Sequence, residues 1–293
     1  MNPSMWTSYL VESSPADMAK TMGAHGWSTC ELSDEHGHDL LKMGAPDKVG
    51  AEFRELAAEC GMSFPQGHFY LCTKGIRPDD LEGRKVADIA PADDAEFEQA
   101  MDDMKRWVDL FNALGVNAGV LHVGGQKLAA AGWEPERILA RRLEAVGRVA
   151  DHARGGVTRI CLENLGHAMT FATFEQMAEV VQGVNADNVG YCLDTGHAHL
   201  SKVDNPDFIR QAGDRLWALH IADNLGAGDD HMLPYGRGTV PWTQVMIALR
   251  EIGYTGLFNF EVPGENRCPI DVRIAKLDYA RLLAKHMIEE DGV

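Results

Sequence analysis

The sequence predicts an α/β fold, namely a (β/α)8 TIM barrel that residues 1–293 form as a single domain. Three observations predict it: short apolar runs alternate with longer amphipathic segments, the alternation continues without a linker or low-complexity break, and the short runs number eight. This pattern is typical of repeated βα units around a parallel sheet. The length of 293 residues suits one such barrel, which commonly uses about 250 residues.

Each expected strand is a short run rich in apolar, β-branched or aromatic residues. In chain order the runs are MWTSYL near Trp6, STCELS near Glu31, FPQGHFYL near His68, AGVLHVGG near His122, RICLENL near Glu163, VGYCLD near Asp194, LWALHIAD near His220 and LFNFEV near Glu261. Eight strands with helices between them favour a closed barrel. An open doubly wound sheet is the alternative, but no G-x-G-x-x-G fingerprint follows the first run.

The segments between the strands have helical periodicity. In AEFRELAAECG, apolar residues recur at three- and four-residue spacing from Phe53 to Cys60, and Gly61 is suited to stop the helix. Similar segments are DAEFEQAMDDMKRWVDLFNALG, ERILARRLEAVGRVADHA, TFEQMAEVVQG and WTQVMIALREIG. Several of them end in glycine shortly before the next strand, as an α-to-β connection requires.

The charge balance indicates which partners to expect. The formal net charge is −17, from 44 acidic and 27 basic residues. No run of Lys or Arg is long enough to follow a phosphate backbone. We therefore expect neither a nucleic-acid partner nor an anionic membrane surface.

The cysteines and the N-terminus indicate the compartment. The six cysteines are scattered and none forms a CxxC pair, which favours reduced thiols over a disulfide framework. The first 20 residues lack a basic region followed by a long apolar one, and no later segment approaches 18 uninterrupted apolar residues. These features predict a cytoplasmic protein that is not exported and does not span a membrane.

Metal-competent side chains stand late in six of the eight expected strands. They are His68, His122, Glu163, Asp194, His220 and Glu261. Burying an unpartnered polar group costs roughly 2–7 kcal/mol, and a charge costs more. Because chemistry in a barrel gathers at the carboxyl ends of the strands, one shared cation is the simplest common partner.

Four of these side chains form the expected metal site, which combines three carboxylates with one imidazole. They are Glu163, Asp194, His220 and Glu261. This mixture suits one divalent ion such as Mn, Co, Mg or Zn. Structural zinc sites favour cysteine-rich sets, and no cysteine joins this one, so we expect the cation to take part in catalysis.

Further polar residues follow the strands. His197 lies in the βα loop after Asp194 and is a candidate for contact with substrate or a second metal, whereas His199 is expected to pack within the loop. The glycine-rich cluster ADNLGAGDDHMLPYGRG adds Asp229, His231 and Arg237 as substrate or second-metal candidates. Trp6 is a candidate wall for a sugar ring.

As an ordered set, these motifs resemble the xylose-isomerase-like TIM-barrel superfamily, which includes the sugar phosphate isomerase/epimerase family. The segments that carry the resemblance are CLEN, CLDTGHAHL, LHIADN, DDHMLPYGRGTVPW and FNFEVPGE. The resemblance implies that Glu163, Asp194, His220 and Glu261 hold a single metal, and that Glu163 and Glu261 exchange a substrate proton. It also implies a small carbohydrate or polyhydroxy carbonyl substrate and is compatible with a homo-oligomer.

The implied reaction is isomerisation or epimerisation through a metal-stabilised ene-diolate. A divalent ion polarises the carbonyl and lowers the pKa of the adjacent C–H, and an acid–base pair then transfers the proton. Ketose 3-epimerases place an arginine shortly after the metal histidine, but HIADNLGAG has none and the next arginine is Arg237. The resemblance therefore does not specify a free ketohexose as the substrate.

Two alternatives stay open. A metal-dependent lyase or dehydratase of a keto-sugar or keto-cyclitol would use the same site and expel a β-hydroxyl. The abasic-site endonucleases of the superfamily use three zinc ions, and this chain has residues to match at His68, His122, His197, Asp229 and His231. The acidic charge opposes this second alternative because gripping a nucleic-acid backbone requires Lys and Arg.

Overall fold

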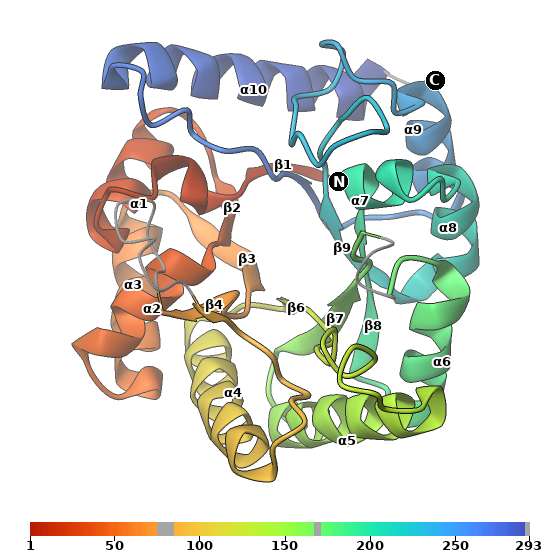
Figure 1. The fold of residues 1–293 in the computed structure, drawn as a ribbon. Helices are drawn as coiled ribbons and strands as arrows, with labels where there is room; N and C mark the ends of the chain where they lie inside the picture. Colours follow the sequence, from red (N-terminus) through yellow and green to blue (C-terminus); the bar gives the residue numbers. More distant parts are fainter. Residues whose placement is uncertain (75–84, 167–170, 291–293) are drawn as a thin grey trace.

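A computed structural model describes residues 1–74, 85–166 and 171–290, and it shows a ring of eight parallel strands surrounded by helices (Figure 1). The strands of the ring are β1 (Asn2–Met5), β2 (Thr29–Leu32), β3 (Ser63–His68), β6 (Ala118–Leu121), β7 (Arg159–Glu163), β8 (Val189–Asp194), β9 (Leu216–His220) and β10 (Leu257–Phe260). All eight coincide with or adjoin the predicted apolar runs. The predicted barrel is confirmed.

The ring closes through two short contacts. Strands β2, β3, β6, β7, β8 and β9 form one sheet in that order, and β1 pairs with β10. Single parallel bridges from Trp6 to Glu31 and from Ile221 to Phe260 join the two sheets. The antiparallel hairpin of β4 (Cys72–Lys74) and β5 (Lys85–Val86) is a separate sheet outside the ring.

Helices cover the outside of the ring, and all but the last of them lie between successive strands of the ring. They are α1 (Pro15–Ala24), α2 (Asp34–Met43), α3 (Pro46–Glu59), α4 (Asp94–Leu114), α5 (Pro135–Ala153), α6 (Phe174–Val184), α7 (Thr195–Leu200), α8 (Asn205–Ala212), α9 (Trp242–Glu251) and α10 (Ile270–Glu290). The five segments with predicted helical periodicity lie in α3, α4, α5, α6 and α9. Helix α3 ends two residues before Gly61, whose φ of +72° places it in the left-handed region that glycine accommodates.

The predicted position of the first strand was wrong. The run MWTSYL was expected to be the strand, but β1 ends at Met5 and Thr7–Leu10 form a 3-10 helix. The Thr7 hydroxyl accepts a hydrogen bond from the backbone N–H of Ser33 at 2.8 Å, which draws this segment across the end of β2. Pairing with β10 places Asn2 and Pro3 in a strand despite their low β-propensity.

The interior of the barrel below the strand ends is filled by small side chains. A buried cluster there consists of Ala118, Val120, Cys161, Cys192 and Ala218. None of the six cysteines forms a disulfide in the structure, and all six lie in the described segments. Among the helices of the described segments, none combines the length and apolarity needed to cross a lipid bilayer.

Candidate metal centre

Four side chains meet at the carboxyl ends of neighbouring strands. Glu163, Asp194 and His220 are the last residues of β7, β8 and β9, and Glu261 follows β10 directly. All four are buried, and one potential ligand atom from each lies within 4.8 Å of the others. The structure therefore brings together the four residues that were predicted to share one cation.

Asp194 is held so that one carboxylate oxygen stays available. Its Oδ1 accepts a hydrogen bond from the backbone N–H of His197 at 2.6 Å and so caps helix α7. The side chain of Asn164 accepts from the Asp194 N–H at 2.7 Å and donates to the Asp194 carbonyl at 2.9 Å. The second oxygen, Oδ2, is buried and finds no hydrogen-bond partner in the described part of the chain.

His220 lies between carboxylates on both edges of its ring. Its Nε2 is 3.0 Å from Glu31 Oε1. Its Nδ1 is 3.2 Å from Glu163 Oε1 and 3.3 Å from Glu261 Oε2. Burial alone would lower the pKa of this imidazole, but the surrounding anionic groups raise it well above its ordinary value.

The two glutamates differ in proton affinity. Burial opposes ionisation of Glu163, but the surrounding histidines hold its pKa well below the ordinary value. His220 and His122 have the largest effect among them. Burial raises the pKa of Glu261 to about 8, and the negative charges of Glu163 and Asp194 add to this effect. Carboxyl groups with divergent pKa values suit an acid–base pair.

The residues fit a divalent cation. Asp194 Oδ2 and Glu261 Oε2 are both buried without a hydrogen-bond partner in segments 1–74, 85–166 and 171–290. Buried polar atoms in native proteins are almost always satisfied, so two such oxygens in one cluster call for a shared partner. Three carboxylates and one imidazole are a donor set for Mn, Co, Mg or Zn.

Three further groups of potential ligands adjoin this centre, and the first of them joins His68 to His220 and Glu261. The second consists of His68, His122 and Glu163. His68 and His122 approach Glu163 Oε2 through their Nε2 atoms, at 3.2 and 3.0 Å. Burial opposes protonation of His68, but the hydrogen bond and charge of Glu163 raise its pKa to about 9. Ligand atoms of these three residues also lie within 4.8 Å of one another.

The third group is formed by His197, Asp229 and His231. The carboxylate of Asp229 lies 3.3 Å from Nε2 of His197 and 3.3 Å from Nε2 of His231. Hydrogen bonds from these two histidines lower the pKa of Asp229. Burial opposes protonation of His231, yet its contacts with Asp229 and Glu261 raise its pKa to about 10.

His197 and His199 are placed differently from the prediction. They were expected in a loop, but both lie in the six-residue helix α7. This segment is too short to show an amphipathic repeat, and the cap from Asp194 starts the helix. His199 contacts Thr239 at 2.8 Å and is not part of a ligand group in the described residues.

The loop that carries Asp229 and His231 is anchored by Asp223. The two carboxylate oxygens of Asp223 accept hydrogen bonds from the Val240 N–H at 3.0 Å and from the Trp242 Nε1–H at 2.8 Å. Gly238 lies so close to this carboxylate that a Cβ there would be 2.1 Å from it. The structure thus ties both ends of the loop to one buried side chain.

Arg237 and Trp6 were also predicted as site residues. Arg237 is exposed on the loop. Trp6 is partly buried, and its backbone forms the bridge to Glu31 that joins the β1–β10 pair to the six-stranded sheet.

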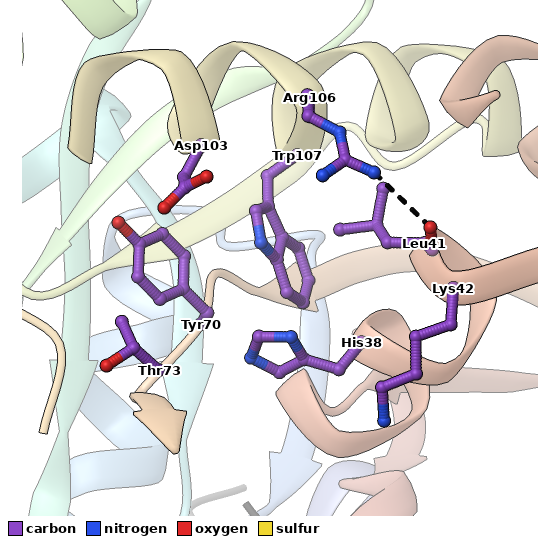
Figure 2. A pocket seen from close by; sticks show the side chains of 8 residues that line it. All are labelled: His38, Leu41, Lys42, Tyr70, Thr73, Asp103, Arg106 and Trp107. Atoms are coloured by element: carbon purple, nitrogen blue, oxygen red, sulfur yellow. Dashed lines mark hydrogen bonds between the residues drawn. The ribbon is translucent and has the colours of Figure 1, made fainter. Parts of the chain in front are cut away.

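A pocket also lies outside the ring of strands. Figure 2 shows Tyr70 beside Trp107 of α4 and His38 of α2, in a pocket of about 180 Å³. The Tyr70 and Trp107 rings stack with centroids 6.0 Å apart, and His38 meets Trp107 edge-on at 5.2 Å. Tyr70 thus lines this pocket together with side chains of α2 and α4.

Three residues that position the site were not predicted to do so: Glu31, Asn164 and Asp223. Glu31 lies one residue before the end of β2, so a carboxylate late in the run STCELS was a signal that could have identified it. The role of Asn164 depends on the spacing between β7 and β8, and that of Asp223 on the path of a loop.

Comparisons with known proteins agree with this geometry. A family model described as xylose isomerase-like TIM barrel matches residues 16–287. An inosose isomerase of Bacillus subtilis strain 168 is 27% identical over 79% of this chain and 82% of that protein. A D-psicose 3-epimerase of Agrobacterium fabrum strain C58 is 26% identical over 79% of each chain. The crystal structure of a D-psicose 3-epimerase in the presence of D-fructose matches with a TM-score of 0.78, at 18% identity and full coverage of both chains.

Proposed function

This chain belongs to the xylose isomerase-like TIM-barrel family, and we propose that it is a divalent-metal-dependent isomerase or epimerase of a small sugar or sugar-derived keto compound. Its homologues include inosose isomerases and sugar epimerases. The observation that carries the proposal is the convergence of four ligand atoms within 4.8 Å at the strand ends. We further propose that residues 1–293 act as one domain.

We assign the cation to Glu163, Asp194, His220 and Glu261. The two oxygens Asp194 Oδ2 and Glu261 Oε2 support this assignment because each is buried and has no hydrogen-bond partner in the described residues. A divalent ion held there would supply positive charge beside the substrate carbonyl and so acidify the adjacent C–H.

Glu163 and Glu261 would transfer the proton. Glu163 favours the ionised form, because imidazoles surround it, and is suited to accept the proton. Glu261 has the higher proton affinity of the two and is suited to return a proton. Transfer to a neighbouring carbon would give an isomerase, and return to the opposite face of the same carbon would give an epimerase.

Deuterium exchange over a panel of candidate substrates tests this proposal. The protein loaded with Mn²⁺ or Co²⁺ would be incubated in deuterated water with ketoses, aldoses and keto-cyclitols, and deuterium at the carbon beside the carbonyl would be followed by NMR. We expect exchange with at least one compound. Glu163→Gln and Glu261→Gln should each slow it by roughly 10²–10⁴-fold.

The matched control is Asp230→Asn, which removes an exposed carboxylate from the loop that carries Asp229. This variant should exchange like the native chain. Native rates in Glu163→Gln or Glu261→Gln would refute the acid–base roles. A product that has lost water would identify the lyase alternative, which uses the same residues.

A second candidate function is supported by two of the additional ligand groups. Glu163 belongs both to the central group and to the group with His68 and His122. The group of His197, Asp229 and His231 adjoins Glu163 through His197, whose Nδ1 lies 3.4 Å from Glu163 Oε1. Three adjacent cations would fit a phosphodiesterase that acts on abasic sites. The net charge of −17 opposes this candidate, and incision of a duplex containing one abasic site would test it.

A further inference from the structure

A chain of four buried polar side chains crosses the barrel next to the metal centre. It runs from Ser4 on β1 through Asn259 on β10 and Glu31 on β2 to His220 on β9, and all four are 0% exposed. The Ser4 hydroxyl donates to Asn259 Oδ1 at 2.7 Å, and Asn259 Nδ2 donates to Glu31 Oε2. Glu31 Oε1 then lies 3.0 Å from His220 Nε2.

The directions of these hydrogen bonds determine what Glu31 offers to His220. Because the Ser4 hydroxyl donates to its Oδ1, Asn259 turns its amide N–H toward Glu31. An ionised carboxylate accepts hydrogen bonds and donates none. Glu31 Oε1 is therefore an acceptor, and His220 must present an N–H at Nε2.

We propose that Glu31 is a positioning residue that holds the proton of His220 on Nε2 and thereby leaves the Nδ1 lone pair for the cation. The proposal rests on the proposed function insofar as it requires a divalent ion at the strand ends. Nδ1 is the ring atom that faces Glu163 and Glu261, at 3.2 and 3.3 Å. A carboxylate behind a metal-binding histidine fixes the ring and increases its basicity.

The contacts oppose a role for Glu31 as a ligand. Both of its oxygens already accept hydrogen bonds, from Asn259 and from His220. Glu31 is also absent from the groups of ligand atoms within 4.8 Å in segments 1–74, 85–166 and 171–290. In the four-residue chain, Glu31 contacts His220 and not the cation site. Glu31 therefore acts on the cation through His220.

The test is direct measurement of Co²⁺ binding, by titration calorimetry on chelator-treated full-length protein without substrate. In Glu31→Gln, the side chain has one acceptor oxygen for two donors, and its own amide N–H competes with the proton on His220 Nε2. We expect Co²⁺ affinity to fall by about 10- to 100-fold. ¹⁵N chemical shifts of the His220 ring would report the protonated nitrogen in the Co²⁺-free protein and in its zinc-bound form.

A double variant separates positioning from simple damage to the core. In Glu31→Gln with Asn259→Asp, the new aspartate accepts the glutamine N–H, so the glutamine carbonyl can again face His220 Nε2. We expect this pair to recover most of the lost Co²⁺ affinity. Cys161→Ala, in the same buried barrel interior and with its thiol directed to the Arg159 carbonyl, should bind Co²⁺ like the native chain.

Three outcomes would overturn the proposal. Native Co²⁺ affinity in a folded Glu31→Gln protein would show that Glu31 does not act on the cation. A double variant no tighter than the single one would show that the acceptor at Nε2 is not the cause. A native chain that binds no Co²⁺ would remove the metal centre itself, which separates failure of the proposed function from failure of the positioning role.

Discussion

The side chain of Asn164 pairs with the backbone of Asp194 as a residue of a neighbouring strand would, accepting from its N–H at 2.7 Å and donating to its carbonyl at 2.9 Å. Strand β7 ends one residue earlier, at Glu163. The amide thus extends the ladder past the end of the strand and holds Asp194 with one oxygen toward the metal centre.

Asn164→Ala should therefore affect both stability and metal binding. Leaving the buried N–H and carbonyl of Asp194 unsatisfied should lower the free energy of unfolding by about 1–3 kcal/mol. Loss of the fixed carboxylate should weaken Co²⁺ binding by about 10-fold. Urea unfolding and titration calorimetry would measure the two effects.

Asn188→Ala is the control for this prediction. Asn188 donates a side-chain hydrogen bond to the Ala150 carbonyl at 2.8 Å, at the opposite end of β8 from Asp194. Its removal should lower stability and leave Co²⁺ affinity unchanged. Equal Co²⁺ affinities in the two variants would contradict the role of Asn164.

Metal content should distinguish the two candidate functions. We expect purified protein to contain about one divalent ion per chain by elemental analysis, and chelation should abolish proton exchange until Mn²⁺ or Co²⁺ is restored. About three zinc ions per chain would instead favour the phosphodiesterase candidate. Full activity after the metal has been removed would refute a metal-dependent mechanism.

Gly238→Ala should disturb the loop through its anchor. The added Cβ would lie 2.1 Å from the carboxylate of Asp223, which is buried and cannot shift without losing its bonds to Val240 and Trp242. Overpacking of this kind costs about 1–3 kcal/mol, measurable by urea unfolding. Gly236→Ala on the same loop meets its nearest atom at 3.4 Å and should be nearly neutral.

His38 should make folding sensitive to mild acid. Burial lowers the pKa of His38, although its Nε2–H donates to the Cys72 carbonyl at 2.9 Å. The unfolded chain therefore takes up a proton near pH 6.5, where the folded chain does not. The resulting contribution to stability is complete above about pH 6.5 and is lost as the pH falls toward the folded-state pKa.

His38→Gln removes this titration and retains a side-chain N–H for Cys72. The difference in unfolding free energy between native chain and variant should shrink as the pH is lowered from about 7.5 to about 5.5. Urea titrations at several pH values would measure it. A difference that stays constant or grows on acidification would contradict the prediction.

The barrel and the grouping of its central metal-competent residues could be predicted because both depend on local pattern. Apolar runs mark the strands, and a barrel places the last residue of each strand at one face, so Glu163, Asp194 and His220 could be grouped without coordinates. Asp229 and His231, which were predicted as substrate or second-metal candidates, lie beside His197 in the structure.

The remaining features depend on contacts between distant segments. The role of Glu31 requires that side chains of β2 and β9 meet inside the barrel. Helix α7 forms because of a cap rather than a repeat. The position of β1 depends on its pairing with β10. The exposure of Arg237 depends on the path of a long loop.

The pairing of β1 with β10 affects the order in which the chain folds. The hydrogen bond from Ser4 to Asn259 spans 255 positions of the chain, and every ladder partner of β1 lies in β10. Such distant pairing is slow to form, because the intervening chain must first be ordered. During synthesis β1 would wait for nearly the whole chain to emerge from the ribosome. Glu31 and His220 would meet only when the ring closes, so we expect cation uptake to be a late event in the maturation of this protein.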